Sequence, residues 1–278
     1  LMKMWILTGR NHLYAKQNRV AANRLADEVQ ACIEADEALV NEYHTVDGGK
    51  YYGFGLSEHI GFVYWNDEDN KPPIRRYITP ANRPRMIVSR VEDPEYATGF
   101  WWNGRKPQVW QDFLRPDVSQ VAFDVACGSK CPISWHIETD CPWMQFRCTG
   151  GTVAENQRVT LTIDRSQITG KAAGQFAVVN EHIQEGTGAA NIIVEVDNTP
   201  VSYPKGTFVE ANGYIAMEAQ HYTAKRDVPG GGFALLKPYG RLGTALKVFP
   251  ATANFENSEE RPYLEYTFAA AKDGNYHV

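Results

Sequence analysis

Residues 158–164 read RVTLTID, and this short stretch decides the fold class. Its apolar residues Val159, Leu161 and Ile163 alternate with threonines, which is the two-residue period of a β-strand with one buried face. The same alternation recurs in MIVSRVE (86–92), VAFDVACG (121–128), ISWHIETD (133–140), WMQFRCTG (143–150), GQFAVVNEH (174–182) and NIIVEVDN (191–198). Turn residues separate these strands and no helix lies between them, so we expect an antiparallel β-sandwich over residues 85–200.

The N-terminal part has the pattern of a helix instead. No Gly or Pro occurs from Leu13 to Tyr43, and apolar residues recur there at spacings of three, four or seven. They are Ala22, Leu25, Val29, Cys32, Leu39 and Tyr43. We therefore expect one long amphipathic helix that buries a face against other helices. The end of another helix is the alternative for the residues before Gly9, and we expect the remaining partners to lie upstream.

Two proline-containing segments separate these regions. KPPIRRYITPANRP at 71–84 and PVSYPKG at 200–206 are typical of extended linkers, because proline opposes helix formation. The sequence thus predicts a helical segment with its linker at 1–84, the sandwich at 85–200, and a further β domain at 201–278. That last region offers too few strands for a complete sandwich, so we expect only its beginning.

The composition excludes several classes of protein. The chain has 278 residues and a net charge of −5, and it contains no long basic run, which argues against a nucleic-acid scaffold. No stretch approaches the ~20 apolar residues that a membrane helix needs, and the first residues lack a signal-peptide cleavage pattern. We therefore predict neither a nucleic-acid partner nor a membrane.

Four of the five cysteines lie close together in the predicted sandwich. They are Cys127, Cys131, Cys141 and Cys148, and Cys32 stands apart. Their spacing does not fit the usual zinc motifs, so one or two disulfides are favoured over a metal site. Free buried thiols remain the alternative, and the pairing is open.

The familiar catalytic and cofactor motifs are absent from the sequence. GTGAAN at 186–191 lacks the third glycine and the following helix of a dinucleotide loop, and PGGGF at 229–233 lacks the ending of a phosphate loop. The seven histidines are dispersed, and no G-x-S-x-G occurs. We therefore predict no metal and no cofactor. Carboxylates conceivable in glycoside hydrolysis are Glu58, Glu210, Glu218 and Asp227, each more commonly solvated and inert.

Aromatic residues are abundant, with 7 Trp, 14 Tyr and 12 Phe. Phe100, Trp101, Trp102 and Trp110 gather between predicted strands. Flat rings of this kind stack on sugars when exposed, but packing at the sandwich end or against a neighbouring domain is favoured.

Four stretches in order along the chain resemble one enzyme family. They are YAKQNRVAANRLADEVQACIEADEALVNEYHT (14–45), HIGFVYWN (59–66), YIAMEAQHYTAK (214–225) and YGRLGTALKVFP (239–250). Together they are similar to glycoside hydrolase family 115, the xylan α-glucuronidases. In that family a catalytic (β/α)₈-type barrel precedes a helical domain, a β-sandwich and a C-terminal jelly-roll-like domain. Only the last three have counterparts here.

The resemblance carries expectations about function. The parent enzyme would hydrolyse (4-O-methyl-)glucuronic acid side groups from xylan, whereas this chain, without the barrel, would be a non-catalytic C-terminal region. Its partners would be the upstream barrel, a xylan-derived oligosaccharide and a second copy in a homodimer. Secretion to the extracellular space follows from the polymeric substrate.

The matched stretches supply candidate sugar contacts. His59, Tyr64 and Trp65 lie in HIGFVYWN, and Tyr239 and Arg241 lie in YGRLG. Arg241 is the best of them, because a guanidinium can clamp the carboxylate of an acidic sugar. Packing and structural salt bridges are the competing roles. Two other hypotheses are a free-standing carbohydrate-binding module and an extracellular assembly domain stapled by disulfides.

Overall fold

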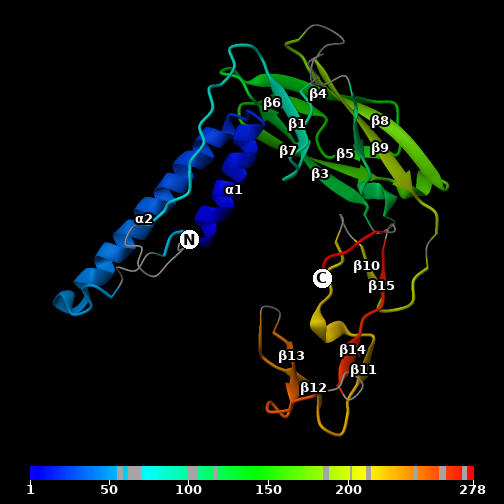
Figure 1. Ribbon diagram of the computed structural model, residues 1–278. Coiled ribbons are helices and arrows are strands. Elements are labelled where there is room, and N and C mark those ends of the chain that lie inside the picture. Colours follow the sequence, from blue (N-terminus) through cyan, green and yellow to red (C-terminus); the bar gives the residue numbers. More distant parts are fainter. Residues whose placement is uncertain are drawn as a thin grey trace. The chain divides into compact units, whose positions relative to one another are not determined.

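The computed structural model describes residues 1–54, 59–61, 70–98, 106–115, 118–183, 188–200, 202–210, 214–240, 243–256, 261–270 and 274–278. The chain divides into two compact units, Leu1–Thr199 and Pro200–Val278. The first holds two helices and the two sheets of a sandwich, and the second holds short strand pairs (Figure 1). The protein is thus mainly β with N-terminal helices, as the sequence predicts. The finer boundaries at 84 and 200 stay predictions.

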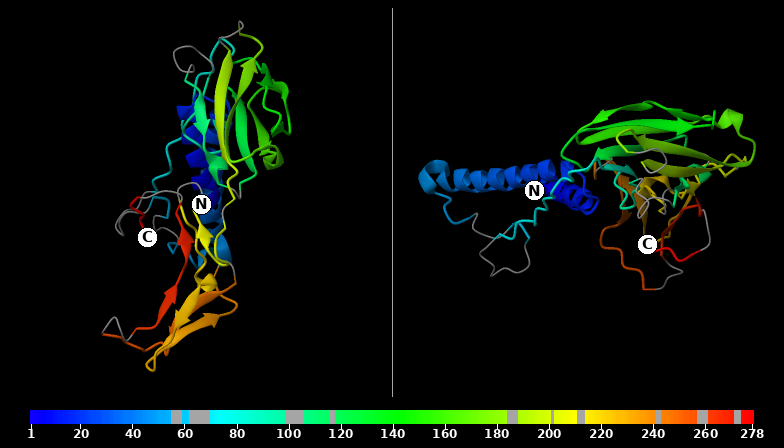
Figure 2. Two further views of the ribbon diagram at one scale, coloured as in Figure 1. Left: turned by 90° about the vertical axis from the view of Figure 1, so that its right-hand side faces the viewer. Right: turned by 90° about the horizontal axis from the view of Figure 1, so that it is seen from above.

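The N-terminal region forms two helices, and the boundary between them differs from the one expected at Leu13. Helix α1 spans Met2–Lys16 and helix α2 spans Ala21–Gly49. Between them Asn18 adopts a positive φ of 57°, a conformation that Asn tolerates better than most residues and that ends the first helix. The two helices lie side by side and run in opposite directions (Figures 1 and 2).

Part of the predicted helix partner is therefore inside this chain. The buried cluster between α1 and α2 consists of Met4, Leu7, Tyr14, Ala21, Ala22, Leu25, Val29 and Ile33, joined by Ile60 from the segment after α2. Beyond Ile33 the apolar residues of α2 lose this cover, and Leu39 and Tyr43 are exposed. Within the bounds of α2, Val46, Asp47 and Gly48 have non-helical backbone angles.

The sandwich consists of a four-stranded and a five-stranded sheet. The four-stranded sheet has the order β1-β3-β7-β5, with β1 at Met86–Arg90, β3 at Gln120–Cys127, β7 at Asn156–Ile163 and β5 at Met144–Phe146. The five-stranded sheet has the order β2-β9-β8-β4-β6, with β2 at Gln108–Trp110, β9 at Ala189–Asp197, β8 at Lys171–Asn180, β4 at Ile133–Thr139 and β6 at Gly150–Val153. All neighbours are antiparallel except β2 and β9, which are parallel.

The inner faces of the two sheets form the core. Trp110, Phe123 and Phe176 meet at its centre, with ring centroids 5.4–5.7 Å apart. Trp110 is thus a core residue, which agrees with the packing alternative, while Phe100, Trp101 and Trp102 lie outside the described residues. The stretch RVTLTID is β7, with Val159, Leu161 and Ile163 buried as predicted.

Short one-turn helices join some of these strands. They are η1 at Asp112–Leu114, η2 at Arg165–Gln167 and, in the second unit, η3 at Ala219–His221. The stretch WMQFRCTG becomes two strands in different sheets, because β5 ends at Phe146 and β6 begins at Gly150. The alternation of apolar and polar residues does not show where the chain crosses from one sheet to the other.

The second unit is built of two-stranded pieces. Strand β10 (Phe208–Val209) pairs with β15 (Phe268–Ala269), β11 (Ala224–Arg226) with β14 (Tyr263–Glu265), and β12 (Gly232–Leu236) with β13 (Ala245–Phe249). The pair β10–β15 is parallel and the other two are antiparallel. The unit is thus made of β-strands, as predicted, and its jelly-roll-like character stays a prediction.

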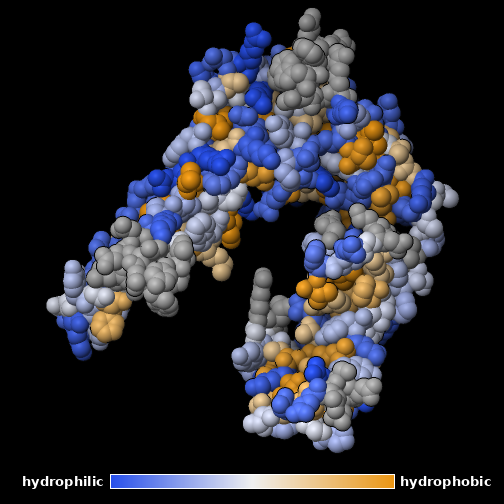
Figure 3. Space-filling model, in the orientation of Figure 1, coloured by the Kyte–Doolittle hydropathy of each residue, from blue (hydrophilic) through white to orange (hydrophobic). Residues whose placement is uncertain are grey.

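Strands β12 and β13 present one continuous apolar face. Phe233 lies opposite Val248, and Leu235 lies opposite Leu246, so all four side chains share a face. Leu235 is 47% exposed, and Figure 3 shows apolar residues at the surface of this unit.

None of the helices in the described ranges combines the length and apolar character that crossing a membrane requires.

Candidate functional site

The outer face of the four-stranded sheet is divided into a covered part and an open part. In the covered part the turn between α1 and α2 lies against the sheet, and Val20 N donates to Cys127 O at 2.8 Å. There Arg19 and Asp124 are almost fully buried, with exposed fractions of 1% and 0%. A charge buried so deeply must be matched by neighbouring polar groups.

Asp124 collects donors from both the helices and the sheet. Its carboxylate accepts from Arg19 at 3.4 Å, from Arg158 Nε at 3.1 Å and from Tyr14 Oη at 3.5 Å. Arg19 also donates to Asn156 Oδ1 at 3.1 Å and to Ser89 Oγ, and its guanidinium lies over the Tyr14 ring at 4.4 Å. Tyr14, Arg19 and Asp124 thus form a buried polar cluster that joins α1 to the sandwich, which is a structural role.

The pKa values in this buried polar cluster follow from its burial and from its charges. Burial, and then the nearby Asp124 carboxylate, raise the pKa of Tyr14 above its usual value, so the phenol stays protonated and donates. Burial also lowers the pKa of Arg19. The bond to Asp124 raises the pKa of the more exposed Arg158.

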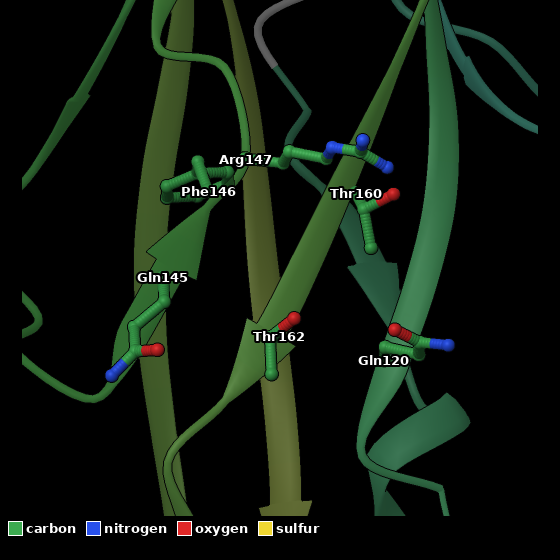
Figure 4. Close-up of a pocket in the computed structure, with 6 residues that line it drawn as sticks. All are labelled: Gln120, Gln145, Phe146, Arg147, Thr160 and Thr162. Carbon is green, nitrogen blue, oxygen red and sulfur yellow. The ribbon is translucent and has the colours of Figure 1, made fainter.

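The open part of the same face carries a polar depression of about 320 Å³ (Figure 4). Its lining comes from β3, β5, β7 and the residue after β5: Gln120, Gln145, Phe146, Arg147, Thr160 and Thr162. The strand register places Gln120 and Gln145 on opposite sides of Thr162, so the three form a row across the sheet. Neighbouring strands are about 4.8 Å apart, which makes this row about 10 Å long.

Arg147 borders this row at the end of β5. Its backbone N donates to Thr160 O at 3.0 Å, which continues the pairing of β5 with β7. The side chain reaches across β7 above Thr160, while the ring of Phe146 points the other way, toward the core (Figure 4). The depression and the guanidinium therefore lie together on the paired strands β5 and β7.

A second depression, of about 810 Å³, lies on the five-stranded sheet. It is lined by Ile137, Glu138, Thr139, Asp140, Gln175, Phe176, Ala177 and Asn191. Several of its polar groups already bond to other groups of the protein: Gln175 Nε2 donates to Asn191 Oδ1 at 3.2 Å, and Thr139 Oγ1 donates to Gln175 O at 2.9 Å.

His136 lies beside this second depression between two carboxylates. Its Nε2 is 3.1 Å from Glu138 Oε1, and its Nδ1 is 3.1 Å from Glu181 Oε1. Ionised carboxylates only accept hydrogen bonds, so both ring nitrogens must donate and the imidazolium is favoured. The bonds to Glu138 and Glu181 accordingly raise the pKa of His136 above 6.5.

The sugar contacts predicted from the sequence do not gather in one described site. His59 Nε2 is 2.6 Å from Asp36 Oδ2 of α2, in the first unit. Tyr239 lies in the second unit, between β12 and β13, and is 64% exposed. Tyr64, Trp65 and Arg241 lie outside the described residues. These roles stay predictions.

The conceivable catalytic carboxylates are also dispersed. Glu210 is buried and accepts from Tyr276 Oη at 2.6 Å, Asp227 pairs with Lys225 at 2.7 Å, and Glu218 precedes η3. Glu58 lies outside the described residues. In the ranges that the structure describes, no group of three or more His, Cys, Asp or Glu residues could hold a metal ion.

The structure contains all five cysteines as free thiols. Cys127 Sγ lies 3.3 Å from Cys131 O, and Cys148 Sγ accepts from Gln157 Nε2 at 3.3 Å. The predicted disulfides stay a prediction, with alkylation as their test.

The depression of Figure 4 was missed by the sequence reading. The outward direction of Thr160 and Thr162 can be read from the alternation in β7. The strand order β3-β7-β5 cannot be read in that way, and only this order brings Gln120, Gln145 and Arg147 to the same place.

Comparison with known proteins gives one family match. Residues 207–278 match the family model "Glycosyl hydrolase family 115 C-terminal domain", which confirms the resemblance of the stretches at 214–225 and 239–250. The second unit is therefore similar to the C-terminal domain of that family. No curated protein matches the chain.

Solved structures show only weak likeness. A Bacteroides ovatus GH5 xyloglucanase in complex with a XXXG heptasaccharide is 17% identical, over 38% of this chain and 20% of that chain, with a TM-score of 0.28. The PapD-like domain 7 of human CEP192 is 9% identical, over 46% and 96%, with a TM-score of 0.30. A putative carbohydrate binding protein from Bacteroides ovatus is 9% identical, over 37% and 42%, with a TM-score of 0.26. This chain spans a fifth of the xyloglucanase, and likenesses at this level carry no argument.

Proposed function

We propose that this chain is the non-catalytic accessory region of a family 115 glycoside hydrolase. The observation that supports it is the match of residues 207–278 to the C-terminal domain of that family. The sandwich and the helix pair would then hold this domain and a catalytic barrel in a fixed arrangement. The parent enzyme would hydrolyse (4-O-methyl-)glucuronic acid side groups from xylan.

The surface of the chain supports a role in packing against another domain. The apolar face shared by Phe233, Leu235, Leu246 and Val248 is only partly covered. Leu39 and Tyr43 of α2 are exposed as well. Apolar groups in such positions gain free energy when a neighbouring domain removes them from water. We propose that the catalytic barrel, and a second copy of the protein, provide this cover.

A free-standing carbohydrate-binding module finds less support. Such modules use exposed aromatic rings on a sheet face, but Trp110 and Trp135 of the sandwich strands are buried. The exposed aromatic side chains of the described residues lie on other elements, for example Tyr52 and Tyr239. We keep secretion as part of the proposal, because the substrate would be a polymer outside the cell.

Assaying the purified chain with aldouronic acids tests the non-catalytic assignment. We expect no glucuronic acid to be released, since the groups proposed for catalysis would lie in the barrel. A family 115 enzyme with its barrel serves as the positive control. Release by this chain that co-purifies with it through successive columns would contradict the proposal.

A further inference from the structure

The depression of Figure 4 differs from the second one in how its polar groups are used. Within the described residues, the side chains of Gln120, Gln145, Arg147, Thr160 and Thr162 make no hydrogen bond or ion pair with the protein. In the depression on the five-stranded sheet, by contrast, Gln175 Nε2 and the Thr139 hydroxyl already donate to other groups of the protein. The first depression therefore offers the donors and acceptors of all five of these side chains to an external ligand.

The arrangement of these groups suits a polyhydroxylated ligand. Each glutamine presents an amide N–H₂ donor and a carbonyl acceptor, and each threonine hydroxyl is both donor and acceptor. Sugar hydroxyls likewise both donate and accept. Because Gln120, Thr162 and Gln145 project from adjacent strands in register, they can contact several hydroxyls without rearrangement of the backbone.

Arg147 adds a single positive charge to this row. Among the described residues that line the depression, it alone is charged. A guanidinium binds a planar anionic group through two parallel hydrogen bonds, and it is more weakly hydrated than an ammonium group. One cation suits a ligand with one negative group, whereas a nucleic acid would require several basic residues along its backbone.

We propose that this face of the sandwich is a binding site for an anionic saccharide. The acidic group, a carboxylate or a sulfate ester, binds the Arg147 guanidinium, and the hydroxyls of the same or the adjacent sugar bind Gln120, Thr162 and Gln145. The volume of about 320 Å³ is at the low end for ligand sites, which suits a short unit of the saccharide. The choice of a saccharide rests on the proposed function, while the choice of an anion rests on Arg147.

Calorimetric titration of the whole chain tests this site. The probes are a xylo-oligosaccharide carrying one glucuronic acid, the same compound with its carboxylate reduced to the alcohol, and a monosulfated oligosaccharide. We expect the carboxylate or the sulfate compound to bind at least about tenfold more tightly than the reduced compound, since a hydrogen bond to a charged group contributes ~1.5–3 kcal/mol. Which of the two binds more tightly identifies the acidic group.

Two charge-matched variants locate the binding. Arg147→Gln should abolish the preference for the acidic compound, and Arg147→Lys should retain part of it. Arg83→Gln removes the same charge from an exposed position of the same unit, outside the depression, and should behave as the wild type. Circular dichroism of each variant verifies that it is folded.

The proposal would be overturned if the folded wild-type chain bound neither acidic compound at a concentration of ~1 mM. A Kd of that size corresponds to a binding free energy of about 4 kcal/mol. Equal binding by Arg147→Gln and Arg83→Gln would also overturn it. Its failure is separate from that of the proposed function, because an accessory region can pack on a barrel without binding sugar. Conversely, the site could bind an acidic saccharide in a chain that has no barrel.

Discussion

Replacing Asp124 by Asn tests whether the helix pair is locked to the sandwich by a buried ion pair. The carboxylate is fully buried and accepts from Arg19, Arg158 and Tyr14. Without its charge, the Arg19 guanidinium stays buried and loses its counter-ion. Removing one partner of a buried pair costs ~3–5 kcal/mol.

The lower end of that range applies here for a structural reason. Arg19 keeps its bonds to Asn156 and Ser89, so the guanidinium remains partly satisfied. We therefore expect Asp124→Asn to lower the free energy of unfolding by about 3 kcal/mol. For a unit the size of Leu1–Thr199, this corresponds to a fall in Tm of roughly 6–12 °C.

Urea denaturation followed by tryptophan fluorescence measures this effect, because Trp110 and Trp135 are buried in the sandwich core. The control is Arg158→Gln, whose side chain is 53% exposed and whose loss should cost at most ~1 kcal/mol. The double variant Arg19→Met, Asp124→Leu should recover much of the loss, since it leaves no unpaired buried charge. An Asp124→Asn variant no less stable than the Arg158→Gln control would refute the reasoning.

Three further predictions follow from individual residues. Gly174→Ala should destabilise the sandwich by about 1–3 kcal/mol, because a Cβ there would lie 2.5 Å from Cys141 Sγ. Gly9→Ala in α1 meets nothing within 4 Å and should stabilise the protein by up to about 1 kcal/mol. Denaturation midpoints measure both changes. Because the pKa of His136 is raised, its bonds to the two carboxylates should stabilise the fold below pH 6.5, and this stabilisation should disappear as the pH rises through the folded-state pKa. Glu138→Gln should lower the pKa of His136 in an NMR titration. An unchanged pKa would count against the bond between His136 and Glu138. Alkylation of the denatured, unreduced chain should modify two fewer cysteines for each predicted disulfide, and modification of all five, which are free thiols in the structure, would contradict the disulfide prediction.

The sequence was most informative where the alternation of apolar and polar residues matches the alternation of buried and exposed positions in a strand. In β7, Val159, Leu161 and Ile163 are buried as the alternation predicts. The C-terminal resemblance was carried by residues 214–225 and 239–250, within the segment that the family model matches. Both conclusions depend on local sequence alone.

The sequence was less informative where distant segments meet. The long helix predicted from Leu13 begins only at Ala21, because Asn18 takes a positive φ and Arg19 turns toward Asp124, a residue more than a hundred positions away. The depression beside Arg147 depends on strand order in the same way. A buried ion pair and a row across three strands leave no periodic signal along the chain.

The reading frame of the gene around this segment tests the central claim most directly. If the chain is the accessory region of a family 115 glycoside hydrolase, the transcript should encode a (β/α)₈-type barrel in frame upstream of residue 1. A start codon immediately before this segment, with no barrel in the same transcript, would contradict the account.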